Sequence, residues 1–402
     1  MKFDRRRMLT AGGLGAALGA LRPRYLYAAQ LAASHGEIYR QIGVRPLINA
    51  AGTYTTLTGS VMPDRVVQAM GEAARCFVPL IDLQRVVGAR IAKLLEADAA
   101  MVTSGAAGSI LLATAACVTG GDPDKIRRIP DTAGMKNEVI VPRAHRNGFD
   151  HAARTVGTRF LEVDTIEQVR SAIGAKTAML YWTHIFEPKG KITRAEFLAA
   201  GKAAGVPVFN DAAAELPPAE NLKGIAKEGF DLVAFSGGKG LRGPQSSGLL
   251  VGRKDLIEAA HLNNNPHSSI GRPMKVGKEE IMGLLAAVEV YLSRDHEADQ
   301  RLWRGFMESI VKDLKGITGV KAEIYVPGPG GHPIPYLRVE WDRARVPLSY
   351  QECGRQLREG EPRIEVNVSA QEGLSLASYN LFPGEERIVG WRLREILREA
   401  AG

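Results

Sequence analysis

The chain has 402 residues, of which 45% are hydrophobic and 24% are charged, as in a globular protein large enough for two domains. Part of the net charge of +8 lies in the first 24 residues, and no basic stretch is interleaved with aromatic residues, which argues against nucleic-acid binding. The longest apolar runs fall short of the roughly 18 residues of a membrane-spanning helix, which argues against stable membrane association.

The N-terminal segment, residues 1–33, has the layout of an export signal. A basic cluster with Arg5 and Arg6 precedes a glycine- and alanine-rich apolar stretch, and further arginines follow. The motif resembles a twin-arginine signal, which exports folded proteins and predicts a periplasmic location. A basic disordered tail is the alternative, and the protein is then cytoplasmic. No A-x-A cleavage site precedes Ser34, so cleavage is expected to be imprecise or absent.

Alternating apolar runs and helical periodicity predict an α/β domain over residues 61–277, after an N-terminal arm at 34–60. The arm is expected to contain a short strand at 46–49. The elements of the domain are expected as strands at 101–102, 138–141, 160–163, 177–182, 206–209, 232–235 and 248–251, and helices at 63–77, 83–95, 109–118 and 193–204. A polar loop at 263–278 marks a boundary before one long helix at 278–315. Residues 316–402 are expected to form a small α+β domain, with strands at 320–326, 336–341 and 362–368 and helices at 349–358 and 384–400.

Three cysteines, Cys76, Cys117 and Cys353, are too widely spaced for a metal cluster or a disulfide framework, so no metal site is expected. Cys76 and Cys117 lie in apolar helical surroundings and are expected to pack in the core.

A strand–turn–helix junction at residues 103–108 offers free backbone N–H groups at a positive helix end. Such a junction binds phosphate without a lysine, although the same glycine-containing turn is also a common tight turn.

Asp211 and Lys239 each follow a short apolar strand, where reactive groups of α/β sheets are found. A lysine that forms a Schiff base and a carboxylate that keeps a ring nitrogen protonated are what pyridoxal phosphate requires. The cofactor's positive ring is expected to lower the pKa of Asp211. Glycines before Lys239 are expected to make room for a flat ring. The alternative is that Asp211 caps a helix and Lys239 is a solvated loop residue.

Seven motifs in this order resemble fold-type I pyridoxal-phosphate enzymes, and in particular the selenocysteine synthase-like group that includes D-glucosaminate-6-phosphate ammonia lyase. They are INAAGTYTTLTGS, VTSGAAGS, PRAHRNGFDHA, FNDAAAE, FSGGKGLRGPQSSGLLVG, IGRPMKVGKEEI and NLFPGEE, and the resemblance covers roughly residues 37–400. It implies the aspartate aminotransferase fold, in which a large domain with a mixed, mostly parallel sheet precedes a small α+β domain.

The resemblance also assigns roles to individual residues. Lys239 becomes the Schiff-base lysine, Asp211 the partner of the ring nitrogen, and His145 the residue lying against the ring, with Asn147 a weaker candidate. The cofactor is further bound by Ser104, Gly105, Ala106 and Ser236, with Ala213 beneath the ring. Arg363 corresponds to an arginine that binds the carboxylate of the substrate. The equally favoured alternative is that Arg363 is a surface residue. Arg272 and Lys275 are candidates for binding a phosphate across the interface of a homodimer or higher homo-oligomer; solvated loop charges are the alternative.

The expected function is a lyase that performs α,β-elimination, with release of ammonia or water, on a hydroxylated or sugar-derived amino acid. An aminotransferase or racemase shares the first carbanion and stays open, as does a catalytically silent member of the fold. A tRNA-dependent role is disfavoured, because the separate N-terminal domain of true selenocysteine synthases is not found and an exported protein does not meet charged tRNA.

Overall fold

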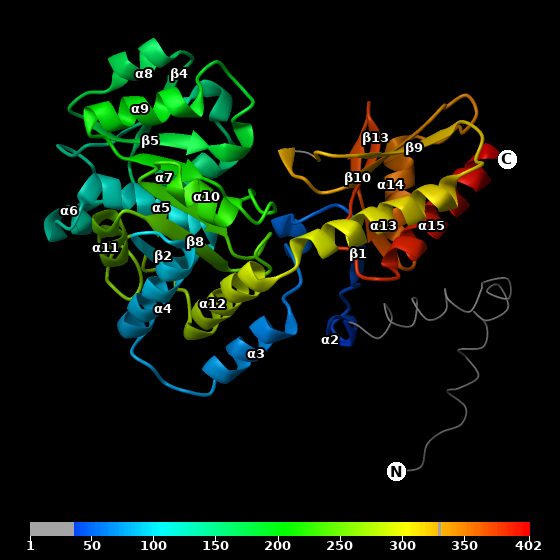
Figure 1. The fold of residues 1–402 in the computed structure, drawn as a ribbon, viewed down its shortest axis with the longest axis horizontal. Helices are drawn as coiled ribbons and strands as arrows, with labels where there is room; N and C mark the ends of the chain where they lie inside the picture. Colours follow the sequence, from blue (N-terminus) through cyan, green and yellow to red (C-terminus); the bar gives the residue numbers. More distant parts are fainter. Residues whose placement is uncertain (1–35, 329–330) are drawn as a thin grey trace. The chain divides into compact units, whose positions relative to one another are not determined.

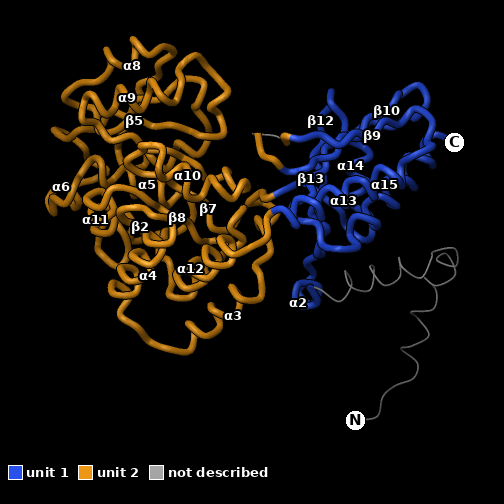
Figure 2. Tube along the Cα trace, in the orientation of Figure 1, with its two compact units in different colours: residues 1–52, 297–326, 334–402 blue, residues 53–296, 327–333 orange. Residues whose placement is uncertain are grey.

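The computed structural model describes residues 36–328 and 331–402, and the expected export signal lies outside them. The described chain forms two compact units, each discontinuous in sequence (Figure 2). Within the described residues, unit 2 consists of residues 53–296, 327–328 and 331–333, and unit 1 of residues 36–52, 297–326 and 334–402. Among the described residues, no helix is both long and apolar enough to cross a membrane.

Unit 2 is built on a seven-stranded sheet with the order β2-β8-β7-β6-β5-β3-β4 (Figure 1). The strands are β2 (Ala99–Ser104), β3 (Glu138–Pro142), β4 (Arg159–Val163), β5 (Thr177–Thr183), β6 (Val208–Asp211), β7 (Leu232–Ser236) and β8 (Ser247–Gly252). β8 runs antiparallel to both of its neighbours, whereas β7, β6, β5, β3 and β4 are mutually parallel. The mixed, mostly parallel sheet expected from the motifs is therefore confirmed.

Both faces of this sheet are buried, because alternate side chains of each strand enter opposite cores. In β5, for example, Leu180 and Trp182 belong to one core and Met179 and Tyr181 to the other. Buried residues of α4, α9, α10 and α12 complete the first core, and those of α5 and α11 complete the second. This explains why the strands appear in the sequence as continuous apolar runs.

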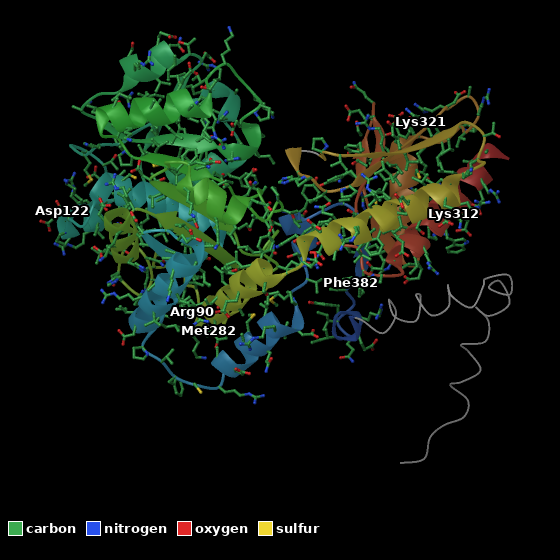
Figure 3. All side chains as sticks on the ribbon, in the orientation of Figure 1. Arg90, Asp122, Met282, Lys312, Lys321 and Phe382 are labelled. Atoms are coloured by element: carbon green, nitrogen blue, oxygen red, sulfur yellow. The ribbon has the colours of Figure 1, made fainter. Side chains whose placement is uncertain are left out.

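The helices of unit 2 lie before, between and after these strands along the chain. They are α3 (Asp64–Ala73), α4 (Leu80–Leu95), α5 (Gly105–Thr119), α6 (Pro123–Arg128), α7 (His151–Arg154), α8 (Ile166–Ala172), α9 (Arg194–Ala204), α10 (Asn221–Lys227), α11 (Lys254–Leu262) and α12 (Lys278–Ser293). α4 is linked to α12 at the surface, where Arg90 (labelled in Figure 3) donates a hydrogen bond of 2.7 Å to Glu289.

The single helix expected at 278–315 is wrong. α12 ends at Ser293, Arg294 adopts an extended backbone with ψ 145°, and a second helix, α13 (His296–Leu314), begins two residues later. The boundary between the two units falls at this break, between residues 296 and 297.

Unit 1 is α+β, as expected for residues 316–402, and it also contains residues 36–52 of the expected arm and residues 297–315 of the expected bridging helix. A four-stranded sheet with the order β12-β13-β10-β9 and a two-stranded sheet of β1 and β11 pack with the helices. The elements are α2 (Glu37–Arg40), β1 (Leu47–Asn49), most of α13, β9 (Val320–Tyr325), β10 (Tyr336–Trp341), α14 (Tyr350–Glu359), β11 (Arg363–Glu365), β12 (Asn367–Ser369), β13 (Gly373–Ala377) and α15 (Glu385–Ala401). The strand expected at 362–368 is two strands, because β11 pairs with β1 and β12 pairs with β13.

The prediction that Cys76 packs in the core is wrong, because this residue follows the end of α3 and is exposed. Cys117 is largely buried in α5, and burial raises the pKa of its thiol to about 12. Cys353 is buried in unit 1.

Candidate functional site

The ends of β6 and β7 bring Asp211 and Lys239 to the same edge of the large sheet. The two strands are parallel neighbours in which Asp211 pairs with Ala234, and Lys239 follows three residues after β7 ends. Asp211 is itself the last residue of β6 rather than the residue after the strand. The arrangement places an acid and a lysine where parallel sheets present their reactive groups.

Asp211 is held at this edge by two hydrogen bonds. The Tyr181 hydroxyl donates to Oδ2 over 3.3 Å, and the Ala213 N–H donates to Oδ1 over 3.2 Å. Burial raises the pKa of Asp211, and the Ala213 N–H, Lys239 and Tyr181 oppose this rise without cancelling it. The pKa of this carboxyl is thus shifted upward in the protein alone, whereas the expected downward shift was an effect of the ring nitrogen.

Lys239 lies in a loop that is anchored to a distant segment. The Ser60 hydroxyl lies 2.9 Å from the carbonyl oxygens of both Gly238 and Lys239. Burial lowers the pKa of the Lys239 ammonium, and the charges of Asp211 and Glu215 partly restore it. A lysine with a lowered pKa has more of the neutral amine that a nucleophile or base requires.

The glycines before Lys239 have a different role from the one expected. A Cβ atom on Gly237 would lie 2.0 Å from the Ser247 hydroxyl, and one on Gly238 would lie 2.7 Å from the Cα of Gln245. These glycines therefore permit close packing of the lysine loop against the segment that leads into β8. Room for a flat ring is not what they provide.

The expected phosphate turn lies beside this loop, across β8. Ser104 at the end of β2 pairs with Ser247, and Ser236 at the end of β7 pairs with Gly248, so both serines flank the start of β8. Gly105 begins α5 with φ +70°, and a Cβ on Gly248 would lie 2.3 Å from its carbonyl. The turn therefore sits directly on the sheet, and the first N–H groups of α5, including that of Ala106, have no partner within the helix.

His145 occupies a more interior position than a residue that lies against a cofactor ring needs. Its side chain is 1% exposed, and its ring meets Trp182 edge-on with centroids 4.1 Å apart. Nδ1 accepts a hydrogen bond of 3.3 Å from the Thr183 N–H, whereas Nε2 has no partner among the described residues. Burial lowers the pKa of His145 to about 4. Asn147 bonds locally to the His145 carbonyl and to Thr183. The ring-contact role of His145 stays a prediction.

The structure adds three residues to this edge that the motifs did not single out: His184, Glu215 and His332. His184 follows β5, and its Nδ1 lies 3.0 Å from the Asn210 side-chain amide. Glu215 is buried four residues after Asp211. His332 donates from Nδ1 to the Pro217 carbonyl over 3.0 Å, and the charge of Lys239 contributes to its lowered pKa after burial. His184 follows the predicted strand 177–182 by two residues, and Glu215 ends the FNDAAAE motif, so both carry a signal that sequence reasoning can use; His332 carries none.

The three candidate substrate-binding cations belong to other segments of the chain. Arg272 and Lys275 are exposed in the loop before α12, and Arg272 donates to the Asn265 side chain. Arg363 belongs to unit 1, where its Nη2 donates to Glu365 over 2.7 Å. Their roles toward a substrate stay predictions.

The residues at this edge fit pyridoxal phosphate. Asp211 is a buried carboxyl group whose pKa is raised by burial, and a protonated ring nitrogen beside it would favour its ionised form. Lys239 supplies the amine, and the turn at Ser104 to Ala106 with Ser236 supplies donors for a phosphate. The glycines at 105 and 248 keep this turn close to the sheet.

Comparison with known proteins adds independent information. The sequence profile of the SelA family, L-seryl-tRNA selenium transferase, matches residues 47–303. D-glucosaminate-6-phosphate ammonia lyase of Salmonella typhimurium is 33% identical over 91% of this chain and 99% of its own length. A 5'-C-glycyluridine monooxygenase-decarboxylase of a Streptomyces species is 33% identical over 92% of this chain and 94% of its own. The L-seryl-tRNA(Sec) selenium transferase of Edwardsiella ictaluri is 28% identical, over 62% of this chain and 57% of its own.

Solved structures agree with these relatives. The structure of a D-glucosaminate-6-phosphate ammonia-lyase aligns with a TM-score of 0.81 and 33% identity over 91% of this chain and 99% of that one. A serine palmitoyltransferase from S. paucimobilis with bound PLP aligns with a TM-score of 0.56 and 13% identity over 94% of this chain and 100% of that one, which shows the shared fold. The fold expected from the motifs is confirmed.

Proposed function

Because the chain belongs to the L-seryl-tRNA selenium transferase (SelA) family, we propose that it is a pyridoxal-phosphate-dependent lyase acting on a hydroxylated or sugar-derived amino acid. The reaction is an α,β-elimination that releases ammonia or water. The observation that carries this proposal is the similarity to an ammonia lyase along 99% of that enzyme's length. The Lys239–Asp211 pair at the sheet edge supplies the chemistry that such an enzyme needs.

When bound, pyridoxal phosphate supplies a carbonyl for the substrate amine and a ring that withdraws electrons from Cα. The protein supplies the remaining functions. Asp211 presents a carboxylate to the ring nitrogen, and Tyr181 and Ala213 hold that carboxylate in place. Ser104, Gly105, Ala106 and Ser236 bind the phosphate. Burial favours the neutral amine of Lys239, whose Nζ then accepts the proton from the substrate Cα.

A second candidate function is an oxygen-dependent decarboxylation. The monooxygenase-decarboxylase relative supports it, since this relative is also 33% identical over nearly the whole chain. As its name states, that relative uses oxygen and releases carbon dioxide. The selenium transferase relative supports a tRNA-dependent role less well, because this chain spans only 57% of that relative's length.

Product analysis separates these candidates. The purified, cofactor-loaded protein is incubated without oxygen against a panel of D- and L-hydroxy amino acids and amino sugar acids. A lyase forms keto acid and ammonia in equal amounts without a second substrate. Consumption that requires oxygen, or that requires an added keto acid as amino acceptor, contradicts the proposal and identifies a monooxygenase or an aminotransferase.

We further propose that Arg5 and Arg6 direct the folded, cofactor-loaded protein to the periplasm. Replacing both by lysine is expected to retain the protein in the cytoplasm, because the twin-arginine pair is read specifically. The measurement is cell fractionation with immunodetection, and Arg22→Lys with Arg24→Lys is the matched control. Efficient export of the Arg5→Lys/Arg6→Lys protein contradicts the proposal.

A shared active site in a homodimer or higher homo-oligomer is proposed from the exposed cations Arg272 and Lys275. If Arg272 serves a partner's site, mixing inactive Lys239→Ala and inactive Arg272→Ala proteins creates sites free of both changes. Activity is then expected to recover in part after subunit exchange.

The control for this experiment mixes Lys239→Ala with Asp211→Asn. Both changes lie in one subunit's site, so no mixed oligomer contains an intact site and no activity returns. Absence of recovery in the Arg272→Ala mixture, with exchange demonstrated, places Arg272 in its own subunit's site or outside any site.

A further inference from the structure

Glu215 is a buried carboxyl group at the catalytic edge that the proposed reaction has not yet used. It lies four residues after Asp211 and is 5% exposed. Its Oε1 has no hydrogen-bond partner among the described residues. An ionised carboxylate that lacks donors in such a place is costly, whereas a protonated carboxyl is tolerated.

Two of the charges around Glu215 raise its pKa, as burial does, and two lower it. The pKa of Glu215 is raised to about 8. Burial is the main cause, and the nearby Asp211 and Glu187 contribute to the rise. Lys239 and Arg194 lower it but do not restore the usual value. Glu215 is therefore mostly a neutral acid at pH 7.

A neutral histidine borders this acid. Asn210 donates from Nδ2 to Nδ1 of His184 over 3.0 Å, so the proton of the neutral imidazole resides on Nε2. Burial lowers the pKa of His184 to about 4, which keeps the ring uncharged. Nε2 lies 3.9 Å from Glu215 Oε2, beyond hydrogen-bond range. His184 thus borders one oxygen of Glu215 without ionising the carboxyl, and the other oxygen is left unpartnered.

Glu215 also interacts with the lysine that moves the substrate proton. In its ionised form Glu215 raises the pKa of Lys239, as Asp211 does, so the three groups belong to one electrostatic cluster. An acid and a base whose surroundings shift their pKa values toward neutrality are the pair that an elimination requires.

We propose that Glu215 is the catalytic acid that protonates the departing β-hydroxyl group of the substrate, an inference that rests on the lyase function proposed above. Nζ of Lys239 takes the Cα proton, the electron pair left on Cα forms the Cα–Cβ double bond, and the Cβ–O bond breaks. The oxygen takes the Glu215 proton and leaves as water. The Lys239 ammonium then returns a proton to the Glu215 carboxylate, which resets both groups.

The test compares two leaving groups in wild type and Glu215→Gln. A hydroxyl needs a proton to leave, whereas chloride does not. Glu215→Gln is expected to slow elimination from the hydroxy amino acid by roughly 100-fold or more and from its β-chloro counterpart by less than about threefold. Glu215→Asp keeps an acid and is expected to recover part of the lost rate. Glu220→Gln, an exposed neighbour, is the matched control.

The pH profile gives a second comparison. Because the acid must be protonated, the wild-type rate with the hydroxy substrate is expected to fall as pH rises through about 8, and this fall is absent with the chloro substrate. Equal slowing of both substrates in Glu215→Gln means a structural role, and no slowing of either means that Lys239 protonates the leaving group. Either result overturns the proposal.

A measurement without turnover completes the test. Infrared difference spectra of substrate-free wild type and Glu215→Gln at pH 7 are expected to show a protonated carboxyl C=O stretch that the variant lacks. Its absence overturns the proposal even if elimination is observed. Conversely, a wild-type protein that shows the stretch but eliminates neither substrate refutes the lyase function and with it the catalytic role of Glu215.

Discussion

Replacing Lys239 by alanine is expected to lower turnover by roughly 10⁴-fold or more, because the substitution removes both the cofactor-binding amine and the base at Cα. The fold should persist, since the Lys239 loop is held by backbone contacts to Ser60 and not by the lysine side chain. Steady-state product formation measures the loss, and circular dichroism checks the fold.

Lys223→Ala is the matched control, because Lys223 is an exposed lysine of the same unit that pairs with Glu96 at the surface. Its activity should equal that of the wild type. Turnover by Lys239→Ala above a tenth of the wild-type rate, by a protein free of wild-type contamination, would be incompatible with the assigned role.

Replacing Asp211 by asparagine is expected to lower the rate on the order of 10²–10³-fold while cofactor binding weakens modestly. The amide keeps the size of the side chain, and its one oxygen can still accept from the Ala213 N–H, but it loses the second acceptor, which faces Tyr181, and the charge that holds the ring nitrogen protonated. The measurements are kcat and a cofactor-binding titration by absorbance.

Asp255→Asn removes an exposed carboxylate that pairs with Arg253 and serves as the control. An unchanged rate in Asp211→Asn would show that the carboxylate opposite the ring nitrogen belongs to another residue. A large loss of cofactor binding with an unchanged rate per bound cofactor would have the same meaning.

The sheet was predictable from sequence because its strands are buried on both faces. Runs such as Leu232–Phe235 are continuously apolar, and polar residues mark the ends where the reactive groups stand. The same logic located Asp211 and Lys239, since parallel strands place successive strand ends at one edge. The strand–turn–helix pattern at residues 103–108 likewise located the turn that is predicted to bind phosphate.

The remaining features depend on contacts that the sequence does not encode locally. His332 reaches the site from a segment, residues 327–333, that is far along the chain but belongs to unit 2. Gly237 and Gly238 were predicted to make room for a ligand, although the atoms that they approach closely belong to Ser247 and Gln245 of the protein itself. The helix break at Arg294 lies within a continuous helical pattern.

The directions of the pKa shifts could not be predicted from the sequence either. An acid beside a lysine is ordinarily expected to have a lowered pKa, yet burial reverses the sign for Asp211 and dominates for Glu215. Burial is a property of the assembled unit, so strand-end position alone indicates which groups meet but not their protonation states.

The central claim, that Lys239 binds pyridoxal phosphate, is tested most directly by borohydride reduction of the purified protein followed by peptide mapping. Reduction should abolish the cofactor's visible absorbance and fix its mass on one lysine. After trypsin digestion, the account predicts the label on the peptide of residues 228–242, EGFDLVAFSGGKGLR, with cleavage blocked at Lys239. A label on any other lysine, or none in a protein that carries the cofactor, would contradict the account.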